Sequence, residues 1–292
     1  MKNKPDNFIV NTVISKDGTK IGYRKIGNGK GLIIAHGGGR ISQNYEQLAH
    51  ALADRFTVYI PDRRGRGLSG EEGPGYDLAK AAEDLEAVIN ATNTSFIFGH
   101  SAGGLVALET MLLYPLEKSA LYDVPFSFNH SVPTEWFPDF EKALEEKKLK
   151  RATAILLKGL QVVEGMNKMP TWSILLLVNI LSLFQRGDTK TKMLTLVPTV
   201  RADIRMVMEA DSKYGRYSSI NIPVALMLGS KSPTYFHEGA RSMIPLLKRS
   251  VTKIFEKLDH SAPEEESEAI ANYLKEFYQP DLKHIGDHIE SY

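Results

Sequence analysis

Short apolar runs alternate with longer segments of helical period along most of this 292-residue chain, and this alternation restricts the possible folds more than any other feature. The runs at 31–35, 56–60 and 95–98 are short and apolar, and each is followed by a segment of helical period. Such runs are typical of parallel strands, because crossover helices cover both faces of a parallel sheet. The alternation resumes at 222–230 and 251–258. The sequence therefore predicts an α/β fold with a mostly parallel, doubly wound sheet.

The alternation stops between 127 and 215, where the spacing of apolar residues is helical and no convincing strand occurs. This stretch follows the strand-like run "SALYDV" at 119–124, which is the sixth along the chain, and precedes the run at 222–230. We therefore expect an all-helical cap at 127–215, inserted after the sixth strand. The core is then made of 1–126 and 216–292.

The first two strand-like runs, 8–14 and 20–26, flank an Asp-Gly pair and predict a hairpin. Amphipathic spacing predicts the helices that cover the sheet. These are 42–54, 77–92, 102–114, 235–249 and 262–279.

Composition excludes several kinds of site. The formal net charge is +1, so charge gives no reason to expect nucleic acid or an anionic membrane as partner. Cysteine is absent, which excludes disulfides, thiolate metal sites and a cysteine nucleophile. A cysteine-free chain without a signal-peptide pattern is expected to be cytoplasmic.

The longest apolar stretch is "WSILLLVNILSLF" at 172–184. A bilayer span needs about 20 such residues, so no membrane span is expected. The stretch is instead predicted to be a buried or groove-lining helix.

Residues 95–109, "SFIFGHSAGGLVALE", place a serine between two apolar runs. Gly99, Ser101 and Gly103 form the pattern Gly-x-Ser-x-Gly, which alone is a weak signal. Here it follows an expected strand and opens an expected helix, which is the setting of a nucleophile elbow. Such a turn strains the backbone and exposes the hydroxyl above the sheet, and the glycines avoid collisions with neighbouring elements. The context predicts Ser101 as a nucleophile, the alternative being a turn serine that caps a helix.

A nucleophilic serine needs hydrogen-bond donors for the oxyanion that forms on attack. The N–H of Ala102, directly after Ser101, is one expected donor. The segment "HGGG" at 36–39 ends an earlier strand and supplies the other, with Gly38 as first choice and Gly37 as second. A plain glycine-rich turn is the alternative for this segment.

These motifs together resemble the α/β-hydrolase superfamily, in particular its cap-bearing branch of serine esterases and lactonases. The matching segments are "HGGG", "PDRRGRGLS" at 61–69, "GHSAGG" at 99–104 and "FEKLDHSAP" with His260. The resemblance covers nearly the whole chain. It implies a structural role for 61–69, whose arginines either form a solvated basic turn, the favoured alternative, or bind an anionic group.

The resemblance also implies a base and an acid. His260 follows the last strand, where the family has its catalytic histidine. Most members carry the acid after the strand at 222–230, where this chain has Ser232. A subset carries it one strand earlier, where Asp123 stands. Asp123 is therefore the expected acid, with Glu238 or no direct acid as alternatives.

Together these residues predict a hydrolase that cleaves a carboxylic ester or lactone through an acyl-enzyme on Ser101, without a metal ion or cofactor. A serine at the elbow, where other branches have an aspartate, argues against epoxide hydrolase and dehalogenase chemistry. The alternatives are a C–C bond, amide or thioester hydrolase and a slow-turnover small-molecule receptor. The apolar cap favours a bulky hydrophobic substrate, including a macrocyclic one.

Five residues are candidates for contact with the substrate. His36 is more consistent with an anchor for the loop at 36–39, and His100 with packing beneath the turn. The large aromatic side chains of the cap suit its own core as well as a pocket. No pattern indicates an oligomeric state. The five are His36, His100, Trp136, Phe137 and Trp172.

Overall fold

A computed structural model describes residues 7–163, 165–184 and 193–279. Its described strands form one sheet in the order β1-β2-β4-β3-β5-β6-β7-β8. The first pairings, β1 with β2 and β2 with β4, are antiparallel, and all the others are parallel. The predicted mostly parallel sheet is therefore confirmed. The strands are β1 Ile9–Ile14, β2 Lys20–Ile26, β3 Lys30–Ala35, β4 Phe56–Pro61, β5 Phe96–His100, β6 Lys118–Tyr122, β7 Val224–Gly229 and β8 Ser250–Phe255.

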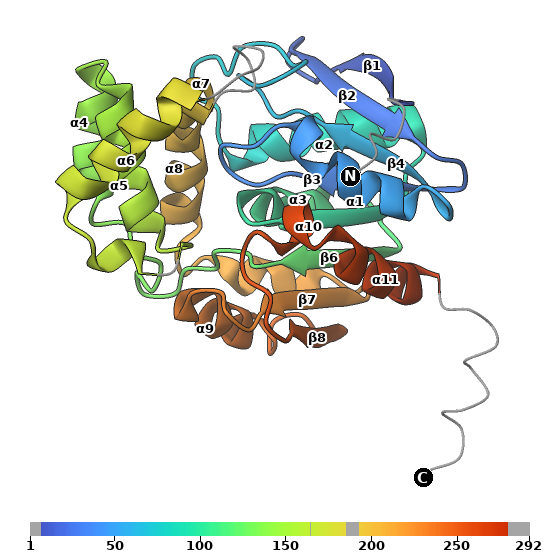
Figure 1. Cartoon of the computed structure of the whole chain (residues 1–292). Helices are drawn as coiled ribbons and strands as arrows, with labels where there is room; N and C mark the ends of the chain where they lie inside the picture. Colours follow the sequence, from blue (N-terminus) through green and yellow to red (C-terminus); the bar gives the residue numbers. More distant parts are fainter. Residues whose placement is uncertain (1–6, 164, 185–192, 280–292) are drawn as a thin grey trace.

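Helices cover both faces of this sheet (Figure 1). One core cluster joins the sheet to α2, α3 and α9, and the other joins it to α1 and α11. The central strands β4, β5 and β7 are buried along their whole length, which explains why their sequences are apolar runs without polar alternation. The core helices are α1 Glu46–Leu52, α2 Leu78–Thr92, α3 Ala102–Leu113, α9 Thr234–Met243, α10 Ala262–Glu265 and α11 Ser267–Tyr278.

The chain between β6 and β7 forms a helical layer beside the carboxyl ends of the parallel strands (Figure 1). This insertion after the sixth strand agrees with the predicted cap, and it has its own cluster of buried apolar side chains. Helix α8 also packs on the core, because Met206 and Val207 belong to the core cluster while Val200 and Ile204 belong to the cap cluster. The cap helices are α4 Phe137–Glu145, α5 Leu149–Leu160, α6 Thr171–Phe184, α7 Met193–Leu196 and α8 Val200–Ala210.

Helix α6 differs from its prediction as a buried or groove-lining helix. Ile174 and Val178 are buried against the cap, but Trp172 and Leu176 are 69% and 54% exposed. Only a narrow side of this apolar helix is thus covered. Among the described residues, no helix combines the length and the hydropathy that a membrane crossing requires.

Two predicted helices end or break earlier than expected. The helix predicted at 235–249 ends at Met243, because Pro245 has no N–H to continue the helical hydrogen bonds, although Ile244 before it still has helical dihedral angles. The helix predicted at 262–279 is interrupted at Glu266, whose φ of −113° and ψ of 43° separate α10 from α11.

Candidate active site

Ser101 lies at the sharp turn between β5 and α3. Its φ is +53° and its ψ is −127°, a sparsely populated conformation that costs about 1–3 kcal/mol and persists only where the surroundings hold it. The Ser101 N–H donates to the Tyr122 carbonyl at 2.9 Å, and the Gly104 N–H donates to the Ser101 carbonyl at 2.8 Å. The turn places Ser101 at the N-terminus of α3, where the helix dipole favours an adjacent anion.

The glycines on either side of Ser101 are required by close packing. A Cβ on Gly103 would lie 2.2 Å from the carbonyl oxygen of Ala35, and one on Gly99 would lie 2.6 Å from the Cα of Gly104. Both contacts involve main-chain atoms, which cannot move aside without distorting the sheet or the helix. The expected collisions of larger side chains at these two positions are confirmed.

His260 lies in the loop between β8 and α10, and its ring is hydrogen-bonded to Asp123, which follows β6. Nδ1 of His260 lies 3.2 Å from Oδ2 of Asp123. An ionised carboxylate only accepts hydrogen bonds, so Nδ1 carries the proton, and Nε2 of the neutral ring keeps a free lone pair. The ring also stacks on Phe236, with centroids 4.7 Å apart.

Ser101 and His260 line the same cavity. Their side chains are not hydrogen-bonded to each other in this structure, where the hydrogen-bond partner of His260 is Asp123. Hydrogen bonds between catalytic groups are often long in the free enzyme and shorten when substrate binds. The arrangement therefore brings a serine and a carboxylate-oriented histidine to one cavity.

The buried Asp123 carboxylate accepts two further hydrogen bonds. Ser232 Oγ donates to Oδ2 at 2.5 Å, and the Gly229 N–H donates to Oδ1 at 3.3 Å. Ser232, at the position where the resemblance leads one to expect the acid in most members, thus donates to a carboxylate that follows the preceding strand. The alternative acid, Glu238 on α9, is not among the hydrogen-bond partners of His260 in the described part of the chain.

The loop after β3 lies directly against the elbow, because a Cβ on Gly37 would lie 3.3 Å from the Cβ of Ser101. The Gly37 N–H donates to Tyr45 Oη at 3.0 Å. It is therefore unavailable to an oxyanion, which corrects the expectation of Gly37 as an alternative donor. The Gly38 N–H has no protein acceptor among the described residues. Ala102 is the first residue of α3, so its N–H has no partner within the helix.

His100 lies beneath the elbow and forms part of the cavity wall. Tyr45 Oη accepts from the Gly37 N–H at 3.0 Å and is hydrogen-bonded to Nδ1 of His100, 2.5 Å away. Burial, together with the nearby ring of His260, lowers the pKa of His100 well below 6.5, and the ring stays neutral.

His36 is also a buried neutral histidine. Its Nε2 accepts from the Arg63 N–H at 3.1 Å, and its Nδ1 lies 3.0 Å from the Gly37 carbonyl. Burial, reinforced by the positive charges of Arg66 and Arg63, lowers its pKa to about 3. His36 joins two loops and does not line the cavity, so its expected contact with substrate is not supported by its position.

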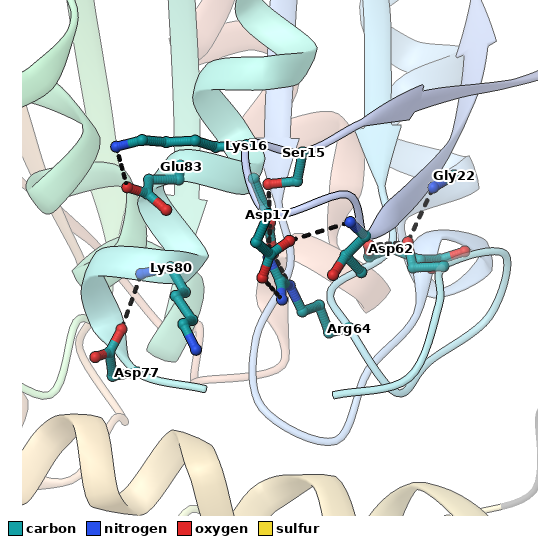
Figure 2. A network of polar contacts seen from close by, with 12 residues as sticks. Ser15, Lys16, Asp17, Gly22, Asp62, Arg64, Asp77, Lys80 and Glu83 are labelled. Atoms are coloured by element: carbon teal, nitrogen blue, oxygen red, sulfur yellow. Dashed lines mark hydrogen bonds and ion pairs between the residues drawn. The ribbon is translucent and has the colours of Figure 1, made fainter. Parts of the chain in front are cut away.

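The arginines of the segment 61–69 are buried, which corrects the prediction of a solvated basic turn. Arg64 is paired with Asp17 of the β1–β2 turn at 2.6 Å (Figure 2) and with Asp84 of α2 at 2.7 Å. Asp62 accepts from the N–H groups of Ser42 and Leu68. Arg63 and Arg66 are likewise paired with a carboxylate of the chain itself, Asp203. Arg63, Arg64 and Arg66 are 5%, 3% and 3% exposed.

The cavity above Ser101 offers about 190 Å³, against roughly 10–15 Å³ for one buried water. The core contributes its polar side, and the cap contributes an almost entirely apolar side. The core residues include Gly38, Arg40, Ser101, His260 and Glu264. The cap residues include Thr153, Leu156, Leu157, Leu160, Val163, Val200, Asp203, Ile204 and Val207.

The three cap aromatics that were candidates for substrate contact lie elsewhere. Phe137 is buried in the cap cluster, and Trp136 packs against it and against Gly159. Trp172 lies on the outer face of α6. None of the three lines the cavity. The aliphatic residues of α5 and α8 that do line it were missed because apolar periodicity marks a buried helix face without showing what covers it.

Within the described ranges, no group of three or more histidine or acidic side chains is placed to hold a metal ion.

Residues 32–273 match the alpha/beta hydrolase family, and the chain belongs to that family. Among solved structures, an alpha/beta hydrolase from Sphaerobacter thermophilus superposes with a TM-score of 0.75 at 27% identity, covering 92% of this chain and 100% of that one. The esterase RhEst1 from Rhodococcus has a TM-score of 0.67 at 21% identity, over 92% and 98% of the two chains. The likeness to this esterase is one of fold.

Among curated proteins, a cis-3-alkyl-4-alkyloxetan-2-one decarboxylase from Shewanella oneidensis is 31% identical over 108 residues. That alignment covers 35% of this chain and 34% of the relative. The chain thus matches about a third of the length of this curated relative.

Proposed function

We propose that this chain is a serine hydrolase that cleaves a carboxylic ester or lactone through an acyl-enzyme on Ser101. One observation carries the proposal. Ser101, strained at the head of α3, shares a cavity with His260, whose Nδ1 is hydrogen-bonded to the buried Asp123. Serine, acid and histidine in this chain order, with the serine at a strand-to-helix turn, are typical of acyl transfer in this fold.

In the first half of the reaction, Nε2 of His260 accepts the Ser101 proton while the serine oxygen attacks the carbonyl carbon. The N–H groups of Gly38 and Ala102 donate to the resulting oxyanion. Asp123 stabilises the imidazolium. The ring then gives its proton to the departing alcohol oxygen as the ester bond breaks.

In the second half, His260 takes a proton from water, whose oxygen attacks the acyl carbon. The same two N–H groups bind the second oxyanion. The acyl–oxygen bond breaks, the proton returns to the Ser101 oxygen, and the carboxylic acid leaves. In a lactone the departing alcohol remains attached, so a single hydroxy acid leaves.

The substrate proposed is bulky and hydrophobic. The cap side of the cavity is formed largely by Leu, Ile and Val side chains of α5 and α8, and burying apolar surface against them contributes about 25 cal/mol per Å². The curated relative from Shewanella oneidensis is named for an alkyl-substituted oxetan-2-one, which is a cyclic ester. This supports including lactones in the substrate class.

The test is turnover of p-nitrophenyl esters of graded acyl length and of a lactone panel, with Ser101→Ala as control. We expect turnover by the native chain and a kcat lower by roughly 10⁴–10⁶ in the variant. Turnover of any of these substrates by Ser101→Ala at the native rate would reject the mechanism. Absence of turnover across both panels would reject the substrate class.

A further inference from the structure

Helix α8 of the cap contacts the loop at 36–39, which carries the proposed oxyanion donor and is called the oxyanion loop below. The contact of α8 with the core centres on one buried carboxylate. Asp203 is 2% exposed and is paired with two arginines of the segment 61–69. Oδ1 lies 2.5 Å from Arg63 Nη1, and Oδ2 lies 2.7 Å from Arg66 Nη2. Arg63, Arg66 and Asp203 are called the arginine clamp below.

The arginine clamp is attached to the loop at 36–39, which carries the proposed oxyanion donor. Arg66 Nη1 donates to the Gly37 carbonyl at 3.4 Å, and its Nη2 also donates to the Thr199 carbonyl of the cap at 3.0 Å. The Arg63 N–H donates to the ring of His36. One guanidinium thus bonds both the cap and the oxyanion loop.

Helix α8 also packs closely against the two glycines that follow Gly37. A Cβ on Gly38 would lie 2.9 Å from Asp203 Oδ2, and one on Gly39 would lie 3.1 Å from Val200 Cγ2. The position of the loop is therefore limited on its outer side by the cap. Its inner side faces Ser101.

We propose that Asp203 and Arg66 are positioning residues through which the cap sets the geometry of the oxyanion loop. This inference rests on the proposed function, because it gives the Gly38 N–H its catalytic role. The cap then does more than enclose the acyl group, because the oxyanion loop keeps its position only while the arginines hold α8 in place. Loss of the arginine clamp would displace the donor without touching Ser101, His260 or Asp123.

The test is Arg66→Met, which removes the bonds of Arg66 to Gly37, Thr199 and Asp203 but leaves Asp203 paired with Arg63. The matched control is Arg205→Gln on the same helix, which breaks an exposed ion pair with Glu141. A misplaced donor lowers kcat by about 10²-fold, and we expect this loss on p-nitrophenyl acetate and octanoate alike, with KM changed less than kcat. Arg66→Lys, which keeps the charge but not the planar fork, should recover only part of the loss.

If α8 only shaped the acyl pocket, octanoate would lose activity and acetate would not, and that result would overturn the proposal, as would unchanged kcat on both esters. Hydrogen–deuterium exchange gives a readout independent of turnover. The peptide containing 36–39 should exchange faster in Arg66→Met than in the native chain, and its exchange rate should not change in Arg205→Gln. Equal protection of this peptide in both variants would also overturn the proposal. If Arg66→Met does not fold, the same measurements of kcat and of exchange are made with Arg66→Lys and compared with Arg205→Gln. Inactivity of the native chain, with the exchange difference present, would reject the proposed function alone.

Discussion

Substitution of Asp123 by asparagine tests how the base is held. The carboxylate accepts from His260 Nδ1, Ser232 Oγ and the Gly229 N–H. In asparagine one of the two oxygens becomes an NH₂ donor. If this group faces the ring, Nδ1 must lose its proton to Nε2, and the tautomer that remains cannot accept the Ser101 proton.

The expected loss of kcat in Asp123→Asn follows from this change of tautomer. The corresponding substitution in a serine protease lowers kcat about 10⁴-fold, which corresponds to about 5.4 kcal/mol at 1.36 kcal/mol per tenfold change. KM should change little, because Asp123 does not line the cavity. If the amide instead turns its NH₂ toward Gly229, two N–H donors face each other, so neither orientation restores the native bonds.

The assay is steady-state hydrolysis of a p-nitrophenyl ester, with a thermal melt to show that the variant folds. Glu238→Gln is the matched control, because Glu238 was the alternative acid and because this substitution also changes a carboxyl to an amide. Asp123→Asn with kcat within tenfold of native, together with a large loss in Glu238→Gln, would refute the assignment.

Two further predictions concern the buried polar groups around the elbow. Tyr45→Phe leaves the Gly37 N–H and His100 Nδ1 without their shared partner, so urea unfolding should show a loss of about 1–3 kcal/mol for each group; an unchanged midpoint would contradict the assigned hydrogen bonds. Burial lowers the pKa of both His36 and His100, so below about pH 6.5 the unfolded chain binds more protons than the folded one. Stability should therefore fall as pH decreases from 6.5 toward 3, by at most about 1.4 kcal/mol per pH unit for each histidine, and a free energy of unfolding that stays constant to pH 4 would contradict the neutral buried state.

The parallel sheet was predictable because fully buried strands have a simple sequence pattern. Runs such as 31–35 and 95–98 are apolar without alternation, and covering them from both faces leaves few architectures open. The elbow was predictable for a related reason, since a serine between two glycines at a strand-to-helix junction is a local pattern. Element ends were harder, and Pro245 shows that a single residue can end a helix whose apolar period continues.

The cap side of the site was not predictable, because it depends on contacts between distant segments. The arginines of 61–69 looked like a solvated turn, since the sequence does not show that Asp203 lies beside them. Trp136 and Trp172 looked like pocket residues because they are large, yet one packs in the cap and the other faces outward. For the arginines and for Trp136 the deciding contact, with Asp203 and with Gly159, lies many residues away along the chain.

The most direct test of the central claim is covalent labelling by a fluorophosphonate, followed by mass spectrometry of the intact chain and of its peptides. The account predicts one adduct per chain, located on Ser101, and labelling about 10³-fold slower in His260→Ala, because the serine then lacks its base. An adduct on another residue, or labelling of His260→Ala at the native rate, would contradict it.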